Sequence, residues 1–328
     1  MKNARNLGSV IFILSVFLFQ MESAASFAEA KTYKTKNVFI AVIDGPRWTE
    51  TWGEKNRKYI PLQNKELSAE GALFTHFLNE GVTNTTSGHT ALVTGFYQEI
   101  DNSGHELPRN SSILQRWLKK TLEPRESAWV IASKDKLAVL ADTTDPDWHE
   151  MSNPRHNCGI NGGGVGSGYR DDSETWKVIQ TTLKEYHPRL VVINFKEPDS
   201  SGHNNQWDQY LKGIQDTDQY VYQLWQLIQK DPFYKDQTTL FITNDHGRHL
   251  DGVKDGFVSH GDSCDGCRHI SLLALGPDFK RGVVIDEKGT QIDVAVTAAL
   301  LLGVEIPGSQ GRVLKEIFIE EPALIAVQ

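Results

Sequence analysis

The pattern of apolar and polar positions changes repeatedly along this chain. Short, nearly continuous apolar runs such as VFIAVID and LVVINF are typical of strands buried on both faces. Between these runs, apolar residues recur at helical spacing. We therefore predict strands over residues 37–43, 128–132, 190–195, 239–243 and 270–275, and helices over residues 61–70, 87–94, 111–120, 173–185, 206–230 and 292–302.

The order of these elements predicts the fold class. Apolar strands that alternate with helices indicate an α/β fold with a doubly wound, mostly parallel central sheet and helices on both faces. In such sheets, ligands bind outside the carboxyl ends of the strands. Polar residues that directly follow a predicted strand are therefore the first candidates for chemistry.

The first 30 residues have the composition of a secretory signal peptide. Lys2 and Arg5 precede the apolar run 8–19, and Ala28 and Ala30 offer a small-residue cleavage site. The run is shorter than the roughly 20 residues that a membrane-spanning helix needs. We expect a periplasmic or secreted protein without a stable membrane anchor after cleavage, and an uncleaved anchor is the alternative.

Residues 31–328 fit a single α/β catalytic domain. Within it, residues 141–172 are rich in Gly, Asp, Asn and Pro. A stretch of this length without a periodic pattern is usually functional or disordered. We expect a Gly-rich insertion that arches over the site. Its glycines do not form a dinucleotide-binding fingerprint, because no strand leads directly into them.

Charge and cysteine content narrow the function classes. The formal net charge is -8 and no block of Lys or Arg occurs, so no nucleic-acid surface is expected. A small phosphate ester remains a plausible substrate, because bound cations would reverse the local field. In an exported protein, one pair among Cys158, Cys264 and Cys267 can be oxidised. Cys264 and Cys267 could close a tight loop; metal ligation and a redox motif are the alternatives.

Metal-ligating side chains gather at or just after the predicted strand ends. Alone, any one of them would most simply be an ordinary polar residue at such a position. Together they supply carboxylate and imidazole ligands for two cations, which suit Zn²⁺, with Mn²⁺ or another divalent metal as the alternative. Two ions about 4 Å apart form the clamp used in phosphoryl transfer, so we predict a two-metal hydrolase. The six residues are Asp44, Asp199, His203, Asp245, His246 and His260.

The segment GVTNTTSGHTALVTG supplies candidate nucleophiles, because it is a hydroxyl-rich turn that leads into a short helix. Ser and Thr often only cap such a helix. A helix N-terminus also presents backbone N–H groups to a phosphate, and a hydroxyl beside a metal ion is a better nucleophile. From the residues alone, Thr85, Thr86 and Ser87 all remain candidates.

Five motifs resemble the alkaline phosphatase superfamily, and within it type I nucleotide pyrophosphatases/phosphodiesterases, over residues 37–279. They are IDGPR, TTSGHTALVTGFY, EPDSSGH, NDHG, and SHG followed by LLALGPDF. The resemblance implies an alkaline phosphatase-like domain. It also implies one zinc held by Asp44, Asp245 and His246, and another held by Asp199, His203 and His260. Counting back from Thr94 and Gly95 in the family pattern makes Thr85 the nucleophile, with Thr86 as the alternative because Thr86, Ser87 and Gly88 depart from that pattern.

The same resemblance implies a zinc-dependent hydrolase of phosphodiester or pyrophosphate bonds that forms a phosphothreonine-type intermediate. Candidate substrate contacts are Asn102, with Asn110 as the alternative, and Arg47. Arg248 and Lys196 are, like Arg47, possible holders of extra phosphate charge. Because the nucleophile segment contains no Lys or Arg, diesters are expected to be preferred over monoesters. Residues 159–168 would border the leaving-group pocket.

Three alternatives are an alkaline phosphomonoesterase, a sulfatase and a catalytically silent binding module. A sulfatase needs a Cys or Ser that is converted to formylglycine, and the count places Thr85 at that position. A binding module would not need all six ligands together with a nucleophile.

Overall fold

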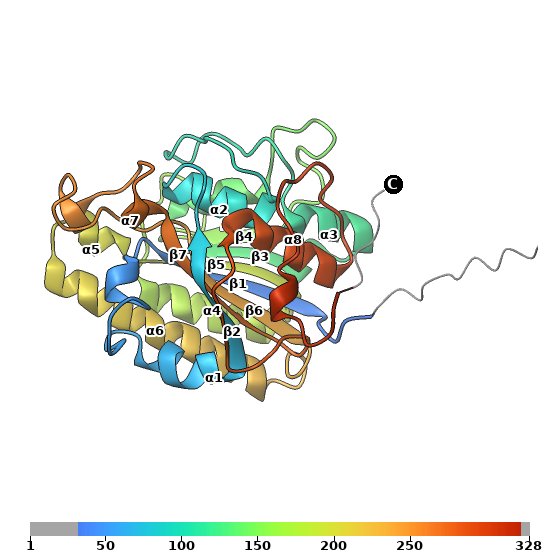
Figure 1. Ribbon diagram of the computed structural model, residues 1–328. Helices are drawn as coiled ribbons and strands as arrows, with labels where there is room; N and C mark the ends of the chain where they lie inside the picture. Colours follow the sequence, from blue (N-terminus) through green and yellow to red (C-terminus); the bar gives the residue numbers. More distant parts are fainter. Residues whose placement is uncertain (1–31, 323–328) are drawn as a thin grey trace, which may run out of the picture. The chain divides into compact units, whose positions relative to one another are not determined.

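The computed structural model describes residues 32–322. Their strands form one mixed sheet with the order β4-β3-β5-β1-β6-β7-β2-β8, and β9 pairs with β2 (Figure 1). The strands are β1 (Asn37–Asp44), β2 (Gly71–Leu78), β3 (Ala128–Ala132), β4 (Arg155–Cys158), β5 (Leu190–Pro198), β6 (Thr238–Asn244), β7 (His269–Leu275), β8 (Val283–Ile285) and β9 (Gly289–Thr290).

Most neighbouring strands are parallel. β4, β3, β5, β1 and β6 run in one direction, and only β7 is antiparallel to its neighbours β6 and β2. All residues of β1 are buried, which explains why this strand is a continuous apolar run. The predicted α/β fold with a mostly parallel central sheet is confirmed.

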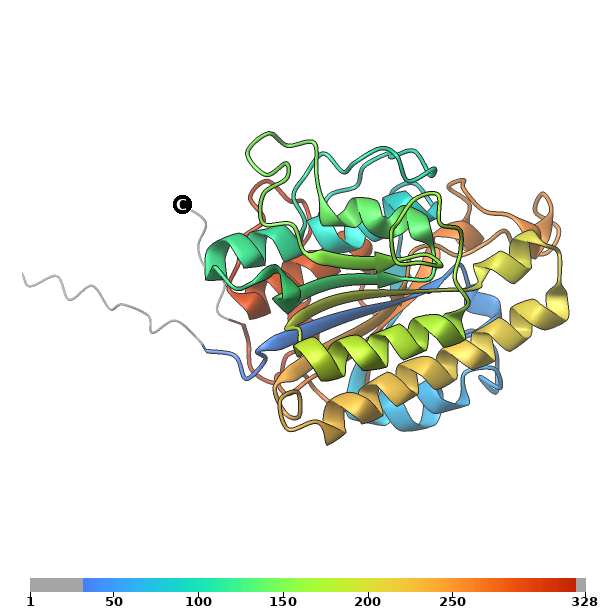
Figure 2. The same ribbon diagram turned by 180° about the vertical axis from the view of Figure 1, so that it is seen from behind.

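Helices cover both faces of the sheet (Figures 1 and 2). Alternate residues of β1 enter two separate cores: Val38 and Ile40 point to one face, and Phe39 and Ala41 to the other. The first face packs against α2 (Thr85–Thr94), α3 (Ile113–Thr121) and α8 (Gln291–Leu302). The second packs against α4 (Asp172–Tyr186) and α6 (Trp207–Lys230).

Shorter helical elements connect these layers. The remaining helices are α1 (Ser68–Glu70), α5 (Asp199–His203), α7 (Asp265–Arg268), and the single turns or 3-10 and π segments η1 (Trp48–Glu50), η2 (Gln63–Leu67), η3 (Arg125–Ser127), η4 (Asp135–Ala141), η5 (Gly256–Val258) and η6 (Lys315–Ile317). None of the helices between residues 32 and 322 has the length and apolarity needed to cross a membrane.

All the predicted strands and helices occur, with small shifts at their ends. Four strands, β2, β4, β8 and β9, were not predicted from the sequence. In β2, Thr75 and His76 interrupt the apolar pattern, and β4 is a polar edge strand of sequence RHNC. Residues 141–172 are therefore not a loop throughout, because β4 lies within them and pairs with β3. The predicted signal peptide lies outside the described residues.

Candidate functional site

Three carboxylates converge at the carboxyl edge of the sheet. β5, β1 and β6 are adjacent and parallel, so their ends lie side by side. Asp44 is the last residue of β1, Asp245 directly follows β6, and Asp199 begins α5 directly after β5. The topology thus brings together residues that are far apart in sequence, at the edge where parallel α/β sheets bind ligands.

Asp44, Asp245 and His246 form a fully buried group that we call the inner triad. His246 Nε2 lies 3.6 Å from Asp44 Oδ1 and 3.4 Å from Asp245 Oδ2. Neither Asp245 Oδ2 nor His246 Nε2 has a hydrogen-bond partner, although both atoms are buried. Unsatisfied buried polar atoms are costly, and one cation between them would satisfy both. The donor set therefore fits a metal ion.

Neighbouring groups orient the inner triad. The Nδ1 atom of His246 lies 2.9 Å from the carbonyl oxygen of Gly247, which leaves Nε2 free to act as a ligand. Asn194 donates to Asp44 Oδ2 over 2.9 Å. Burial, and then the charge of Asp245, raise the pKa of Asp44 to about 7. A cation next to this carboxyl group would stabilise its ionised form and so lower the pKa again.

Asp199, His203 and His260 form the outer triad. The two imidazole Nε2 atoms are 3.0 Å apart, and they lie 3.4 Å (His203) and 3.3 Å (His260) from Asp199 Oδ1. The His203 side chain is 48% exposed, so this triad opens to solvent. Burial lowers the pKa of His203 to about 4, which keeps the ring neutral and able to bind a metal. The ring of His260 stacks on that of His246 and so links the two triads.

Lys134 is a central residue of this site that the sequence analysis missed. It is buried, and its Nζ donates to Asp199 Oδ2 over 2.6 Å, to Asp44 Oδ1 over 2.9 Å and to Thr85 Oγ1 over 3.1 Å. Although burial acts against it, the charges of Asp199 and Asp44 raise the pKa of Lys134. Lys134 is the second residue after the predicted strand 128–132. Like Asp44, it is a polar residue at the carboxyl end of a strand, where ligands bind in such sheets.

Of the three candidate nucleophiles, only Thr85 faces the carboxylates. Its hydroxyl accepts from Lys134 at the first position of α2. Thr86 instead donates its hydroxyl to Asn102 Oδ1 over 3.0 Å, and Ser87 exchanges hydrogen bonds with the backbone of Ile100. Gly88 lets α2 approach this closely, because a Cβ there would lie 2.5 Å from the carbonyl oxygen of Asp245.

A hollow of about 440 Å³ opens beside Thr85. Lys136 lies on its wall and donates to Asn102 Oδ1 over 2.9 Å. Burial, and then the charge of Lys134, lower the pKa of Lys136 to about 8. The full lining is Thr85, Asn102, Lys134, Lys136, Tyr169, Asp199, Ser200, His203 and Asn204.

Of the substrate contacts predicted from the sequence, the structure brings Asn102 to this hollow but not the others. Arg47 is buried and bonded to Glu50 and Asp251. Lys196 pairs with Asp171, and Arg248 donates to Asp199. Neither these three cations nor Asn110 lines it. Lys134 and Lys136 therefore stand where the sequence analysis looked for Arg47, Lys196 or Arg248.

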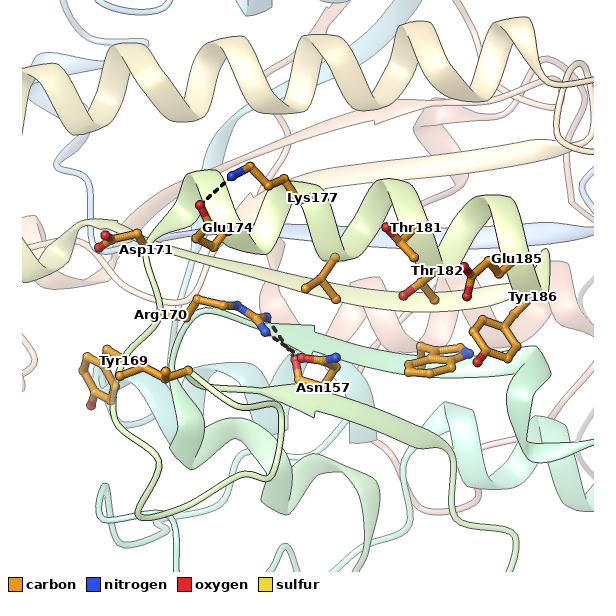
Figure 3. A pocket seen from close by; sticks show the side chains of 13 residues that line it. Asn157, Tyr169, Arg170, Asp171, Glu174, Lys177, Thr181, Thr182, Glu185 and Tyr186 are labelled. Atoms are coloured by element: carbon orange, nitrogen blue, oxygen red, sulfur yellow. Dashed lines mark hydrogen bonds and ion pairs between the residues drawn. The ribbon is translucent and has the colours of Figure 1, made fainter.

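A larger hollow of about 680 Å³ runs along α4 and the edge formed by β3 and β4 (Figure 3). Its charged groups are largely paired: Arg170 donates to Asn157 over 2.6 Å, and Lys177 to Glu174. Both hollows share Tyr169, which ends the Gly-rich stretch. Two hydrogen bonds hold that stretch next to Lys134 and Lys136, because the backbone amides of Gly166 and Gly168 donate to Asp135, which lies between the two lysines. The smaller hollow, which is lined by Thr85 and by Asp199 and His203 of the outer triad, is the candidate site.

Comparison with known proteins identifies the family. A family model described as the Metalloenzyme superfamily matches residues 62–306, well over half of the chain. The chain belongs to the metalloenzyme superfamily. The match spans five of the six triad residues, Thr85 and both lysines, and only Asp44 lies before it.

Individual relatives of this metalloenzyme are distant. A 2,3-bisphosphoglycerate-independent phosphoglycerate mutase from Gracilaria tenuistipitata var. liui is 26% identical over 128 residues, which are 38% of this chain and 23% of the mutase. The chain thus spans less than a quarter of the length of that curated relative.

Solved structures share the fold. The phosphonate monoester hydrolase of Silicibacter pomeroyi superposes with a TM-score of 0.61 at 14% identity, covering 85% of this chain and 76% of the hydrolase. Murine ectonucleotide pyrophosphatase/phosphodiesterase 5 gives a TM-score of 0.60 at 15% identity and covers 86% of this chain and 100% of its own. Others include an alkaline phosphatase superfamily protein and a putative sulfatase by name. These structures confirm the alkaline phosphatase-like fold, whereas the nucleotide pyrophosphatase type is not singled out.

Proposed function

We propose that this metalloenzyme hydrolyses phosphate esters and uses Thr85 as its nucleophile. The observation that carries the proposal is the position of the Thr85 hydroxyl. It lies at the N-terminus of α2, bonded to Lys134, which also bridges Asp44 and Asp199. A phosphoryl group at this point would meet backbone N–H groups, a buried cation and both triads.

The metal ligands are part of the proposal. The inner triad would hold one ion and the outer triad a second, and the mixture of carboxylate and imidazole favours Zn²⁺, with Mn²⁺ as the alternative. A bound ion would supply positive charge that favours the ionised hydroxyl and the developing phosphoryl charge. The expected signal peptide would place this activity in the periplasm or outside the cell.

The residues of the chain suit a two-step displacement. Lys134 donates to Thr85 Oγ1 and thereby stabilises its oxyanion. In the first step, Thr85 Oγ1 bonds to phosphorus as the bond to the leaving-group oxygen breaks. In the second step, water displaces Thr85 and releases phosphate. Because each displacement is in line, the configuration at phosphorus would be retained.

The two lysines change the expected substrate class. The preference for diesters rested on the absence of a cation near the nucleophile, and Lys134 and Lys136 remove that premise. A phosphate monoester carries about one more negative charge than a diester, so a site with an additional cation suits it better. We therefore propose a phosphate monoester as the preferred class.

Diester hydrolysis is the second candidate. Lys134 is already bonded to two carboxylates, so Lys136 is the main cation left to meet extra substrate charge. Sulfate esters are disfavoured, because Thr85 occupies the position at which a sulfatase needs Cys or Ser.

The test is to measure kcat/KM for p-nitrophenyl phosphate, bis-p-nitrophenyl phosphate and p-nitrophenyl sulfate with the zinc-loaded and manganese-loaded protein. We expect the order monoester, diester, sulfate, and loss of all three rates in Thr85→Ala. Preference for the diester would restore the second candidate. Preference for the sulfate, or activity independent of Thr85, would contradict the proposed function.

A further inference from the structure

A second group of metal-ligating side chains lies outside the candidate site, in the segment between β6 and β7. One ligand atom from each of His249, Asp262, Cys264 and Cys267 lies within 4.8 Å of the others. We call these four residues the loop cluster. The proposed hydrolysis does not use any of them.

The histidine of the loop cluster has a free nitrogen. Its ring is buried, and its Nδ1 lies 3.1 Å from Asp255 Oδ1 and 3.2 Å from Ser259 Oγ. These two oxygens favour the tautomer in which Nδ1 carries the proton, so the lone pair of the ring lies on Nε2. Nε2 lies 3.2 Å from Asp262 Oδ2, yet no hydrogen bond joins the two atoms. A lone pair and a carboxylate at this distance repel each other unless a cation lies between them.

The same signature marks the inner triad, where buried His246 Nε2 and Asp245 Oδ2 also lack hydrogen-bond partners. In both places, the side chains point at a common volume and are not aligned to bond with one another. The loop cluster differs in its ligand chemistry, because it adds sulfur to imidazole and carboxylate.

The two cysteines are held on one tight turn. Cys264 precedes the one-turn helix α7, and Cys267 is buried within it; both are free thiols. A C-x-x-C pair combined with a histidine is a pattern of zinc sites. Glycine makes the turn fit: a Cβ at Gly266 would lie 2.4 Å from the carbonyl oxygen of Arg248. This close approach places both sulfurs beside His249.

We propose that His249, Asp262, Cys264 and Cys267 form a structural zinc site. Zn²⁺ binds thiolate, imidazole and carboxylate in a tetrahedron, in which ligand atoms are about 3.3–3.8 Å apart given its bond lengths. A group already within 4.8 Å needs only small side-chain shifts to reach this geometry. The carboxylate of Asp262, which now pairs with Lys254, would bind the metal instead. Four protein ligands leave no open position, so the site is structural and not catalytic.

The site would fasten the segment that carries His260. Asp262 lies two residues beyond His260, and its carbonyl oxygen accepts from the Thr83 hydroxyl over 2.7 Å. The Nδ1 atom of His260 lies 2.7 Å from the carbonyl oxygen of Thr83. Zinc in the loop cluster would therefore hold the loop that presents His260 to Asp199, so it would support the outer triad without contacting substrate.

The test uses the full chain, purified with its thiols reduced and reconstituted with Co²⁺. Thiolate ligation should produce a sulfur-to-cobalt charge-transfer band in the near ultraviolet. The double variant Cys264→Ser/Cys267→Ser should lose this band and about one equivalent of bound metal per chain. Cys158→Ser is the matched control, because Cys158 is buried elsewhere and should leave the band unchanged.

Two further variants keep the result decisive if the double variant does not fold. Asp262→Cys should retain the metal and strengthen the band, since it replaces one ligand with another. Asp245→Asn should keep the band, which separates the loop cluster from the proposed function. Absence of the band in the reduced wild-type protein, or a band that the double variant keeps, would overturn the proposal.

Discussion

The inner and outer triads contain the same ligand types but differ in what already surrounds them. In the inner triad, Asp245 and His246 each have a buried atom without a partner. In the outer triad, both oxygens of Asp199 are engaged, Oδ2 by Lys134 and Oδ1 by Arg248. One fixed cation, Lys134, contacts the inner triad through Asp44, whereas the outer triad must share Asp199 with two fixed cations, Lys134 and Arg248.

This difference suggests unequal metal affinity. Resident cations repel an incoming ion and lower its affinity for a shared carboxylate. The half-exposed His203 gives the outer triad a further disadvantage, because solvent screens its interactions. We therefore expect the inner triad to retain its metal under conditions in which the outer triad loses one.

The largest loss is expected from the inner triad. Asp245→Asn removes a charged ligand from a fully buried group, so metal content and kcat/KM should fall together. We expect a loss of at least about 10³-fold, beyond the roughly 10–100-fold typical of residues that only orient metal ligands. Elemental analysis and p-nitrophenyl phosphate kinetics measure both effects. Asp251→Asn is the control, because this exposed acid lies outside both triads; full activity in Asp245→Asn would reject the inner triad as a ligand set.

The next effect separates chemistry from metal binding. Thr85→Ala should lower kcat by about 10³-fold or more while metal content stays at the wild-type value, because Thr85 is the nucleophile and not a triad member. Trapping of a phosphoprotein at acidic pH should succeed with the wild-type chain only.

Thr86→Ala is the matched variant for this test. Its hydroxyl is bonded to Asn102, whereas Lys134 bonds that of Thr85, so only a modest loss is expected. If Thr86→Ala is inactive and Thr85→Ala retains its rate, the count from Thr94 and Gly95 is wrong by one residue.

Strand-end residues were the part of the site that the sequence analysis could locate. Asp44 and Asp245 follow apolar runs that specify parallel strands, and such strands end at a common edge. Lys134 obeyed the same rule but was missed, because a lysine after a strand is usually a solvated residue and only the fold shows it buried against two aspartates. The bonds of Arg47 to Glu50 and Asp251 likewise depend on how two loops pack together, which the spacing of apolar residues does not predict.

The fold shows the same division. β1 and β5 were predicted well because burial on both faces imposes a continuous apolar sequence. β4 was not predicted, since an edge strand needs only one neighbour and its sequence RHNC carries no apolar pattern. Its place in the sheet is decided by pairing with β3, which is tertiary information.

A smaller effect is expected in the outer triad. His203→Ala should reduce kcat/KM by about 10²-fold, because the second ion would supply several kcal/mol of charge stabilisation, and should lower the bound metal by about one equivalent, leaving the inner ion in place. Titration with a chelator should remove the weaker triad metal first in the wild-type chain and show one release step fewer in the variant. If His203→Ala loses both metals, the two triads bind cooperatively and the unequal-affinity argument fails.

The smallest effect concerns the lysine that faces the hollow. The pKa of Lys136 is lowered to about 8, first by burial and then by the charge of Lys134, so Lys136 is positively charged below about pH 8 and neutral above it. A monoester needs this charge more than a diester does. The kcat/KM for p-nitrophenyl phosphate should therefore fall by roughly 10-fold as pH rises through about 8, and that for bis-p-nitrophenyl phosphate should fall less.

Lys136→Met should remove this descending limb and lower the monoester rate at pH 7, whereas Lys136→Arg should retain the rate and carry it to higher pH. Lys177→Met, in the larger hollow and paired with Glu174, is the control and should leave both profiles unchanged. Identical profiles for Lys136→Met and the wild-type chain would show that Lys136 does not meet the substrate's charge, and the argument for monoesters would then rest on Lys134 alone.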